Sequence, residues 1–387
     1  MIPYGRQDIS DADIEAVVEV LRSDWLTQGP AVPAFEQAVA ERCRVGFAVA
    51  VNSGTSALEV ACQALGLGPG KRLWTVPNTF VASANCARRC GADVDFVDIA
   101  PDTRNLSPEA LSKKLREAEK NNALPDVVVA VHFAGHSCDM ELIAELAGTY
   151  GFRVIEDATH ALGGTYKDAP VGSCRWSDIA VFSFHPVKII AAGEGGMALT
   201  NDAGLAENMR MRRNHGITKD ANRMKRPDDG PWYYEQHFLG ANYRLTDLQA
   251  ALGRSQLQRL DAFLDRRRAI VKAYHAAFAG IDAITLPVER PDTASAWHLY
   301  AIHVNGTSEK RRALFERLQA DGLGVQVHYL PVHLQPYYRE LGFGEGDFPA
   351  AEDHAARAIS LPIFPAMTDD DIQTVVAITT KACADLL

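Results

Sequence analysis

The sequence has no long hydrophobic run. The apolar stretch from Val127 to Val131, for example, is closed by Asp126 and His132, whereas a helix that spans a bilayer needs about 20 apolar residues in succession. The first residues, Met-Ile-Pro-Tyr-Gly-Arg, also lack the charged, apolar and small-residue regions of a secretion signal. We therefore expect a cytoplasmic protein without a membrane partner.

Paired cysteines and metal-ligand spacings are missing as well. The seven cysteines are odd in number and form no Cys-x-x-Cys pair, so neither a disulfide framework nor a structural zinc site is expected. The histidines of the C-terminal part do not have the spacing of zinc ligands; they are His298, His303, His328 and His333. The prediction is a protein that uses no metal.

The net charge is negative, at −10 for 39 Lys and Arg against 49 Asp and Glu. This balance disfavours nucleic acid as a partner, although a local cluster of donors can still bind a small anion. One basic stretch is a candidate for holding a diphosphate, and its alternative is a solvated helix face, because charge runs are usually solvated. The stretch consists of Arg210, Arg212, Arg213 and His215.

Short runs rich in Val and Ile alternate with helical patterns in the first half of the chain. Such runs are typical of strands buried on both faces, and the alternation predicts an α/β fold with a mostly parallel sheet between helices. The predicted strands are residues 47–51, 73–76, 94–97, 127–132, 153–156, 179–184 and 197–200. The predicted helices are residues 11–23, 33–42, 55–65, 82–90, 107–120, 140–150 and 203–213.

The pattern changes after Asn214. Residues 218–236 are polar and interrupted by proline, which predicts a loop. Helical periodicity then runs from about residue 245 to residue 278, and a last helix is expected to start near Thr368. Between them lie a predicted strand, helix and strand at 299–304, 308–321 and 325–328. We expect a large domain over residues 1–255 and a smaller α+β domain over residues 256–387.

A turn suited to phosphate follows the first predicted strand. Asn52-Ser-Gly-Thr-Ser opens a helix, where free backbone N–H groups and the positive helix end point to one place. Gly54 would let a ligand approach the backbone, and the hydroxyls of Thr55 and Ser56 would add donors. A plain capped helix start is the alternative.

Asp157 follows a predicted buried strand. Open α/β sheets bind ligands at the carboxyl ends of their strands, and a buried carboxylate needs a partner of opposite charge. A protonated pyridine nitrogen would be such a partner and would become a better electron sink. The alternative is a carboxylate that caps the next turn.

Lys188 also follows a buried strand, in the stretch Ser183-Phe-His-Pro-Val-Lys, with Gly193-Glu-Gly-Gly close behind. Removal from water lowers the pKa of a lysine and makes its neutral amine available to form a Schiff base. A solvated surface charge is the ordinary interpretation of a lysine. The position of Lys188 downstream of Asp157 and the phosphate turn favours the reactive amine.

With these stretches in this order, the chain resembles the fold-type I enzymes of pyridoxal 5′-phosphate (PLP), in particular the DegT/DnrJ/EryC1/StrS sugar aminotransferases. The resemblance extends over essentially the whole chain and implies a large domain with a mostly parallel seven-stranded sheet. Ser183-Phe-His-Pro-Val-Lys and Pro77-Asn-Thr-Phe-Val-Ala-Ser most resemble the pseudaminic-acid branch. Other matching stretches are Gly29-Pro, Glu156-Asp-Ala-Thr-His-Ala, Gly240-Ala-Asn-Tyr-Arg-Leu, Gln326-Val-His-Tyr and Leu361-Pro.

The resemblance implies roles for individual residues around PLP. Lys188 would carry the cofactor as a Schiff base and shuttle a proton, and Asp157 would pair with the pyridine nitrogen. Phe80 would stack on the ring, and His160 would contact the region of the ring hydroxyl. The phosphate would be bound by Thr55, Ser56 and Ser183, and by Asn242 of the neighbouring subunit, so the active unit would be a homodimer with shared sites.

The sugar-nucleotide site is implied by the same resemblance. Its residues would be Tyr4, Trp25, Leu26, Thr27, Gln28, Gln326, Val327, His328 and Tyr329. L-Glutamate would convert PLP to pyridoxamine 5′-phosphate, and the amino group would then pass to C4 of a UDP-linked 4-keto-6-deoxy-N-acetylhexosamine.

Three alternatives stay open. The substrate could be another UDP- or dTDP-linked 3- or 4-keto sugar. A sugar dehydratase of the same family is disfavoured, because a histidine replaces the lysine in that branch and this chain has Lys188. A catalytically silent regulatory member is disfavoured by the joint presence of Asp157, His160, Ser183, Lys188 and Asn242.

Overall fold

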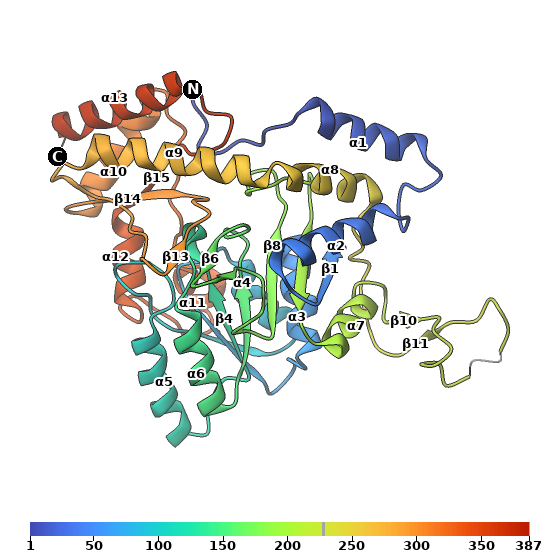
Figure 1. The fold of residues 1–387 in the computed structure, drawn as a ribbon. Helices are drawn as coiled ribbons and strands as arrows, with labels where there is room; N and C mark the ends of the chain where they lie inside the picture. The colour runs from blue at the N-terminus through green and yellow to red at the C-terminus, as the bar shows by residue number, and fades with distance from the viewer. Residues whose placement is uncertain (227–228, 387) are drawn as a thin grey trace.

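A computed structural model describes residues 1–226 and 229–386 of the protein. Its centre is a seven-stranded sheet in the order β1-β9-β8-β5-β4-β2-β3, in which β9 runs opposite to the other six strands (Figure 1). The predicted α/β fold is confirmed, and each of the seven strands predicted in the first half of the chain is found with its ends within one residue. The strands are β1 Phe47–Val51, β2 Arg72–Thr75, β3 Asp93–Phe96, β4 Val127–Val131, β5 Arg153–Asp157, β8 Ile179–Ser183 and β9 Gly196–Thr200.

Helices pack on both faces of this sheet. Alternate residues of β1 show the division, because Val49 and Val51 join one hydrophobic core and Ala48 and Ala50 join the other. The first core is completed by α3 Gly54–Ala64, α4 Ala82–Arg89, α5 Pro108–Lys120, α6 Met140–Tyr150 and α7 Ala203–Arg212. The second core is completed by α2 Ala31–Cys43, α8 Asp247–Gln258 and the start of α9 Leu260–Phe278, while α1 Asp11–Arg22 packs on α8.

The helical pattern at 245–278 forms two helices instead of one, because the chain leaves helical geometry at Arg259 between α8 and α9. Leu260 and Leu264 of α9 pack under the central sheet, whereas Ile270 and Phe278 pack in a third core built from C-terminal residues. Helix α9 therefore spans both parts of the molecule (Figure 1). The division at residue 255 stays a prediction, and its last residue, Leu387, lies outside the described residues.

The C-terminal part is a three-stranded antiparallel sheet with helices. Its strands are β12 Ile284–Thr285, β14 Tyr300–Val304 and β15 Ala358–Leu361, in the order β12-β14-β15. Its helices are α10 Ser308–Ala320, α11 Pro336–Arg339, α12 Pro349–Arg357 and α13 Asp369–Leu386, with a 3₁₀ turn, η2, at Val332–Leu334.

The strand expected at 325–328 does not form. Only Gln326 makes a bridge there, to Ser360 of β15. The peptide group between His328 and Tyr329 bonds to side chains instead, since its carbonyl accepts from His354 and its N–H donates to Asn78. A strand cannot continue where its backbone groups are used in this way.

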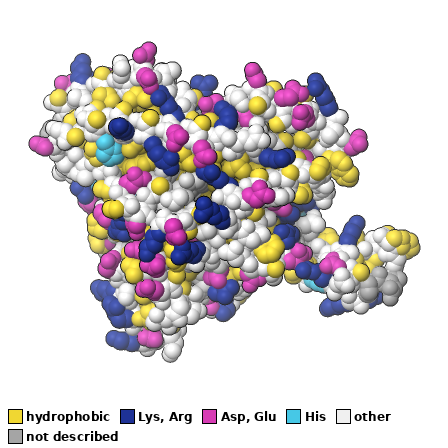
Figure 2. All heavy atoms as spheres, viewed as in Figure 1, with side chains coloured by type: hydrophobic (Ala, Val, Ile, Leu, Met, Phe, Trp, Pro, Cys, Tyr) yellow, Lys and Arg dark blue, Asp and Glu magenta, His cyan; other side chains and the backbone are white. Residues whose placement is uncertain are grey.

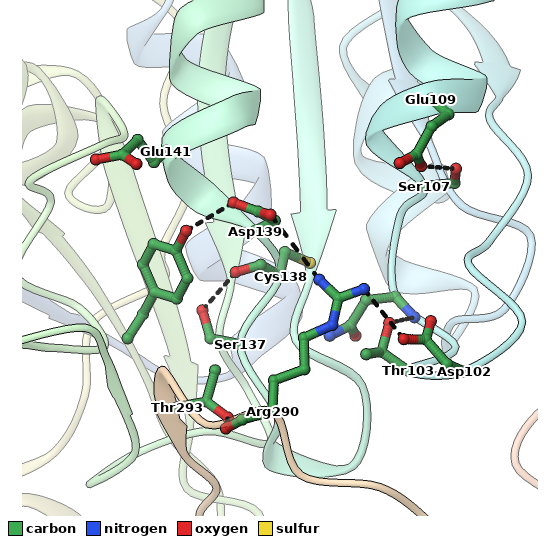
Figure 3. A network of polar contacts seen from close by, with 12 residues as sticks. Asp102, Thr103, Ser107, Glu109, Ser137, Cys138, Asp139, Glu141, Arg290 and Thr293 are labelled. Carbon is green, nitrogen blue, oxygen red and sulfur yellow. Dashed lines mark hydrogen bonds and ion pairs between the residues drawn. The ribbon is translucent and has the colours of Figure 1, made fainter.

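Polar contacts and a small sheet join the two parts. Strand β13 (Thr293–Ala294) pairs with β6 (Thr165–Tyr166), which pairs with β7 (Ala169–Pro170). Beside it, Arg290 reaches Asp102 at 3.1 Å and Asp139 at 3.8 Å, close to the 3₁₀ turn η1, Phe133–Gly135 (Figure 3). These contacts fix the start of the C-terminal part against the loop around residue 102.

The predicted loop at 218–236 projects from the body as an arm (Figures 1 and 2). Its base is a two-stranded ladder between β10 (Ile217–Thr218) and β11 (Glu235–Gln236), and residues 227–228 within it lie outside the described part. Acidic and basic side chains are mixed over the face seen in Figure 2.

None of the described helices has the length and hydropathy that a membrane span requires.

Candidate active site

A cavity of about 600 Å³ opens where β5 and β8 end and α3 begins. Ten of the residues predicted from the sequence line it: Tyr4, Thr55, Phe80, Asp157, Ser183, Lys188, Gln326, Val327, His328 and Tyr329. They come from both parts of the molecule, so the fold brings together side chains up to 325 positions apart, from Tyr4 to Tyr329.

The start of α3 forms one wall. Ser53 caps the helix by accepting the N–H of Ser56 at 3.1 Å, which leaves Thr55 exposed at the cavity. A Cβ on Gly54 would lie 2.9 Å from Cβ of Ser183, so glycine allows α3 to approach the end of β8. The Ser56 hydroxyl is buried and donates to Asn52 at 2.6 Å; it is engaged within the turn and does not line the cavity.

Asp157 lies at the end of β5, buried to 4% exposure. Its carboxylate accepts the Ser83 hydroxyl at 2.6 Å and the Thr159 N–H at 3.2 Å. In the described part of the chain no lysine or arginine forms an ion pair with it, so a buried negative charge faces the cavity with neutral donors alone. Ser83 was missed in the sequence because a serine in the first turn of a helix resembles an ordinary cap.

Lys188 lies five residues beyond the end of β8 and lines the same cavity as Asp157. Removal from water lowers the pKa of its amine to about 8, although the nearby Asp157 charge acts in the opposite direction. The described residues offer this amine no hydrogen bond or ion pair. About a tenth of this amine is therefore neutral, and hence nucleophilic, at pH 7, far more than for an ordinary lysine.

His160 and His298 form a buried pair beside the cavity. Their ring centroids lie 4.3 Å apart, and His160 Nε2 shares a 3.0 Å hydrogen bond with the Tyr329 hydroxyl. Within the described ranges the Nδ1 atoms of both rings have no hydrogen-bond partner. Burial, followed by neighbouring charges that include Lys188, holds the pKa of both rings well below the usual value. No ligand role was predicted for His298, because a histidine just before a strand carries no local signal of one.

The opposite wall is the segment Gln326–Tyr329 together with Tyr4. The His328 ring lies 5.6 Å from the Tyr4 ring and shares a 2.9 Å hydrogen bond with the Ser360 hydroxyl. Burial, with a smaller contribution from Lys188, lowers the pKa of His328 to about 4. This wall therefore presents neutral rings and an amide to a ligand.

The remaining predicted residues lie outside this cavity. Trp25, Leu26, Thr27 and Gln28 are exposed, as is Asn242, which forms a bridge with Asn214. Gln28 lines a second cavity of about 440 Å³ with Arg210 and Arg213. These arginines pair with acids, Arg210 with Glu207 at 3.6 Å and Arg213 with Glu36, so within one chain the basic stretch is not placed at the first cavity.

A sequence profile of the DegT/DnrJ/EryC1/StrS aminotransferase family matches residues 7–380. The chain belongs to that family. It is 40% identical to the spore coat polysaccharide biosynthesis protein SpsC of Bacillus subtilis, over 97% of this chain and 95% of SpsC. The similarity to SpsC thus extends over nearly the full length of both chains.

Solved structures of similar proteins agree with this assignment. PseC of Helicobacter pylori, an aminotransferase involved in the biosynthesis of pseudoaminic acid, superposes with a TM-score of 0.91 at 30% identity, over 99% of both chains. The PLP form of the putative sugar aminotransferase Spr1654 of Streptococcus pneumoniae superposes with a TM-score of 0.90 at 28% identity, over 100% of this chain and 99% of that one. The protein is a PLP-dependent sugar aminotransferase with a sugar substrate and an amino donor.

The cavity fits this cofactor. A protonated pyridine nitrogen would match the buried Asp157 carboxylate, and the helix start at Ser53–Thr55 suits a phosphate. The unpartnered nitrogens of His160 and His298 can bond to polar atoms of a bound ring.

Proposed function

We propose that this aminotransferase transfers the amino group of L-glutamate to C4 of a UDP-linked 4-keto-6-deoxy-N-acetylhexosamine. The chemistry is carried by one observation, the unpaired Lys188 amine in a cavity with the buried Asp157 carboxylate. Similarity to PseC over 99% of both chains supports the choice of sugar.

The proposed cofactor site assigns one task to each residue. Lys188 attaches PLP, Asp157 keeps the pyridine nitrogen protonated, and Phe80, exposed at the cavity, covers the ring face. His160 bonds near the ring hydroxyl. Thr55 and Ser183 bind the phosphate through their hydroxyls, whereas the buried hydroxyl of Ser56 is engaged with Asn52, so Ser56 contributes through the helix start.

When bound, PLP supplies an electron sink that stabilises the carbanion formed on either substrate. The Lys188 amine then moves the proton at its Nζ. It removes a proton from the donor carbon and delivers one to C4 of the sugar from its own side of the cavity, which sets the configuration at C4. Tyr4 and the segment Gln326–Tyr329 orient the sugar nucleotide from the opposite wall.

We further propose a homodimer in which each site is completed by the neighbouring subunit. Asn242 and the segment Trp25–Gln28 are exposed and lie away from the cavity of their own chain, as expected of residues that act across an interface. Asn242 would bind the phosphate of the neighbour's PLP, and Trp25, Leu26, Thr27 and Gln28 would contact the neighbour's sugar nucleotide.

Subunit mixing tests this sharing. Lys188→Ala and Asn242→Ala are expected to be inactive separately. Each mixed dimer would contain one site with both residues intact, so complete exchange should restore about a quarter of the wild-type activity. No recovery in mixed dimers, verified by mass spectrometry of tagged subunits, would contradict sharing.

The substrate is tested with a panel of nucleotide-linked keto sugars, L-glutamate and mass spectrometry. Release of 2-oxoglutarate and of the 4-amino sugar from the UDP-linked substrate is expected. Similarity to SpsC, a spore coat polysaccharide protein, favours including other UDP- and dTDP-linked 3- and 4-keto sugars. Faster turnover of one of these would replace the proposed sugar and leave the aminotransferase assignment unchanged.

A further inference from the structure

One peptide group in the cavity wall is held at both of its ends by buried side chains. The carbonyl of His328 accepts from Nε2 of His354 at 2.8 Å. The N–H of the same peptide group, on Tyr329, donates to Oδ1 of Asn78 at 3.2 Å. Asn78 and His354 are each 1% exposed, so water does not compete for these bonds.

The bond to the His328 carbonyl fixes a chain of proton positions. A carbonyl only accepts, so His354 carries its proton on Nε2 and accepts at Nδ1 from Nε2 of His303, 2.6 Å away. His303 then accepts at Nδ1, where the Arg104 guanidinium donates at 3.1 Å. The longer approach of Arg104 Nε to His303 Nε2, at 3.4 Å, is then a contact without a hydrogen bond, because that nitrogen carries the proton given to His354. Burial lowers the pKa of His354 to about 3, and burial with the Arg104 charge also lowers that of His303, so both rings are neutral.

The series of hydrogen bonds closes on the same peptide group through the backbone of Arg104. The Arg104 carbonyl accepts the Asn78 side-chain amide at 3.2 Å. Arg104 therefore reaches the N–H end of the peptide through Asn78 and the carbonyl end through His303 and His354. The neighbouring Asp102 is itself tied to Arg290 at 3.1 Å (Figure 3), which fixes the loop that carries Arg104.

Among the described residues this peptide group has no hydrogen bond to another backbone group. The segment makes a single bridge to β15, at Gln326. Beyond that bridge, the position of His328 and Tyr329 depends on side chains. The Tyr329 hydroxyl bonds to His160 at 3.0 Å, so a shift of this peptide group would move a polar contact of the cofactor site.

We propose that four residues form a peptide clamp whose function is to position His328 and Tyr329 for transamination. The peptide clamp consists of Asn78, Arg104, His303 and His354. Its members do not line the cavity; they are positioning residues that act through the peptide group. The inference rests on the proposed function, since it requires that His328 and Tyr329 line the working active site.

The test compares three variants of the holoenzyme. His354→Phe keeps the ring shape and removes both bonds, whereas His354→Gln keeps an amide donor near the position of Nε2. His333→Phe is the matched control, because His333 is also fully buried and bonds to Glu352 of α12 at 3.0 Å without contacting the His328–Tyr329 peptide. The half-reaction with L-glutamate is followed by the visible absorbance of lysine-bound PLP, and hydrogen exchange is measured on a peptide that covers residues 326–332.

In His354→Phe we expect the half-reaction to slow about tenfold and the Tyr329 amide to exchange about tenfold faster. His333→Phe should change both less than about twofold at a similar loss of thermal stability, and His354→Gln should recover most of both. Equal effects in the two phenylalanine variants, or no recovery with glutamine, would overturn the peptide clamp.

A second variant keeps the test decisive if His354→Phe does not fold. Asn78→Leu releases the other end of the same peptide group and should also speed exchange at residues 326–332; unchanged exchange there would overturn the proposal. The half-reaction does not involve the sugar, so a wrong sugar leaves the result intact. A wild-type protein without visible absorbance would instead overturn the proposed function itself.

Discussion

The two walls of the active-site cavity are built by different means. The first wall consists of Asp157, Ser183 and Lys188 at or just beyond the ends of two neighbouring strands, β5 and β8. The second wall is the segment Gln326–Tyr329, which has one backbone bridge and is otherwise held by side chains. Strand ends fix the reactive groups directly, whereas the second wall depends on residues that never reach the cavity.

The two walls therefore differ in what a substitution would change, which is the reactive group itself on the first wall and the position of such groups on the second. On the first wall a change of residue removes a reactive group, so its effects should be large and confined to chemistry. On the second wall the residues adjust the geometry of groups that remain present, so effects should be smaller and accompanied by local mobility. The following predictions test this contrast in order of expected effect.

Lys188→Ala should have the largest effect. The visible absorbance of lysine-bound PLP should disappear, and turnover should fall at least about a thousandfold, because the described residues that line the cavity include no other lysine to replace it. Absorbance spectra before and after borohydride measure the first effect. Lys113→Ala, a change of an exposed lysine on α5, is the control. A visible band that survives in Lys188→Ala would contradict the proposal that Lys188 binds PLP.

Asp157→Asn should leave cofactor bound but slow the half-reaction with L-glutamate by about a hundredfold, because the neutral amide no longer keeps the ring nitrogen protonated. The matched control is Asp178→Asn, which lies at the opposite end of the same pair of strands and pairs with Arg153 at 3.0 Å. Stopped-flow absorbance measures the rate of the half-reaction in both variants. Equal rates in the two variants would show that the Asp157 charge is structural.

The rate at which PLP attaches to the apoenzyme should depend on pH through Lys188. Its pKa is lowered to about 8, and only the neutral amine reacts. Below pH 8 the rate should rise about tenfold per pH unit, and above pH 8 it should level off. Rapid-mixing absorbance from pH 6 to 10 measures the curve, with the pH range chosen to bracket about two units on either side. A midpoint near the ordinary lysine value would contradict desolvation as the activating effect.

Tyr329→Phe should give the smallest effect, a slowing of the half-reaction by about three- to fivefold, since one hydrogen bond to His160 is lost while the ring and its peptide remain. Tyr274→Phe is the control, because the Tyr274 hydroxyl donates to the Pro362 carbonyl at 2.8 Å, in the third hydrophobic core. Single-turnover rates with L-glutamate are measured for Tyr329→Phe and for the control Tyr274→Phe. A loss as large as that of Asp157→Asn would erase the contrast between the walls.

Most of the first wall could be predicted locally. Strand β8 is recognisable as a buried apolar run, and Ser183 and Lys188 follow from their position at its end. Ser83 and His298 could not be found in this way, because a serine in a helix start and a histidine before a strand have common structural explanations. Their importance depends on what they meet, which is Asp157 for Ser83 and His160 for His298.

The sequence by itself determined the α/β architecture, the seven strands of the sheet and the set of residues proposed to act on PLP. Periodicity and residue type are local properties, and strand ends in an open sheet are the expected places for ligands. Only the tertiary structure decided that residues 325–328 do not form a strand and that Asn78, Arg104, His303 and His354 meet around one peptide group. Those bonds join positions up to 251 residues apart, from Asn78 to Tyr329, and no local pattern encodes a contact whose partner is chosen by the packing of the whole fold.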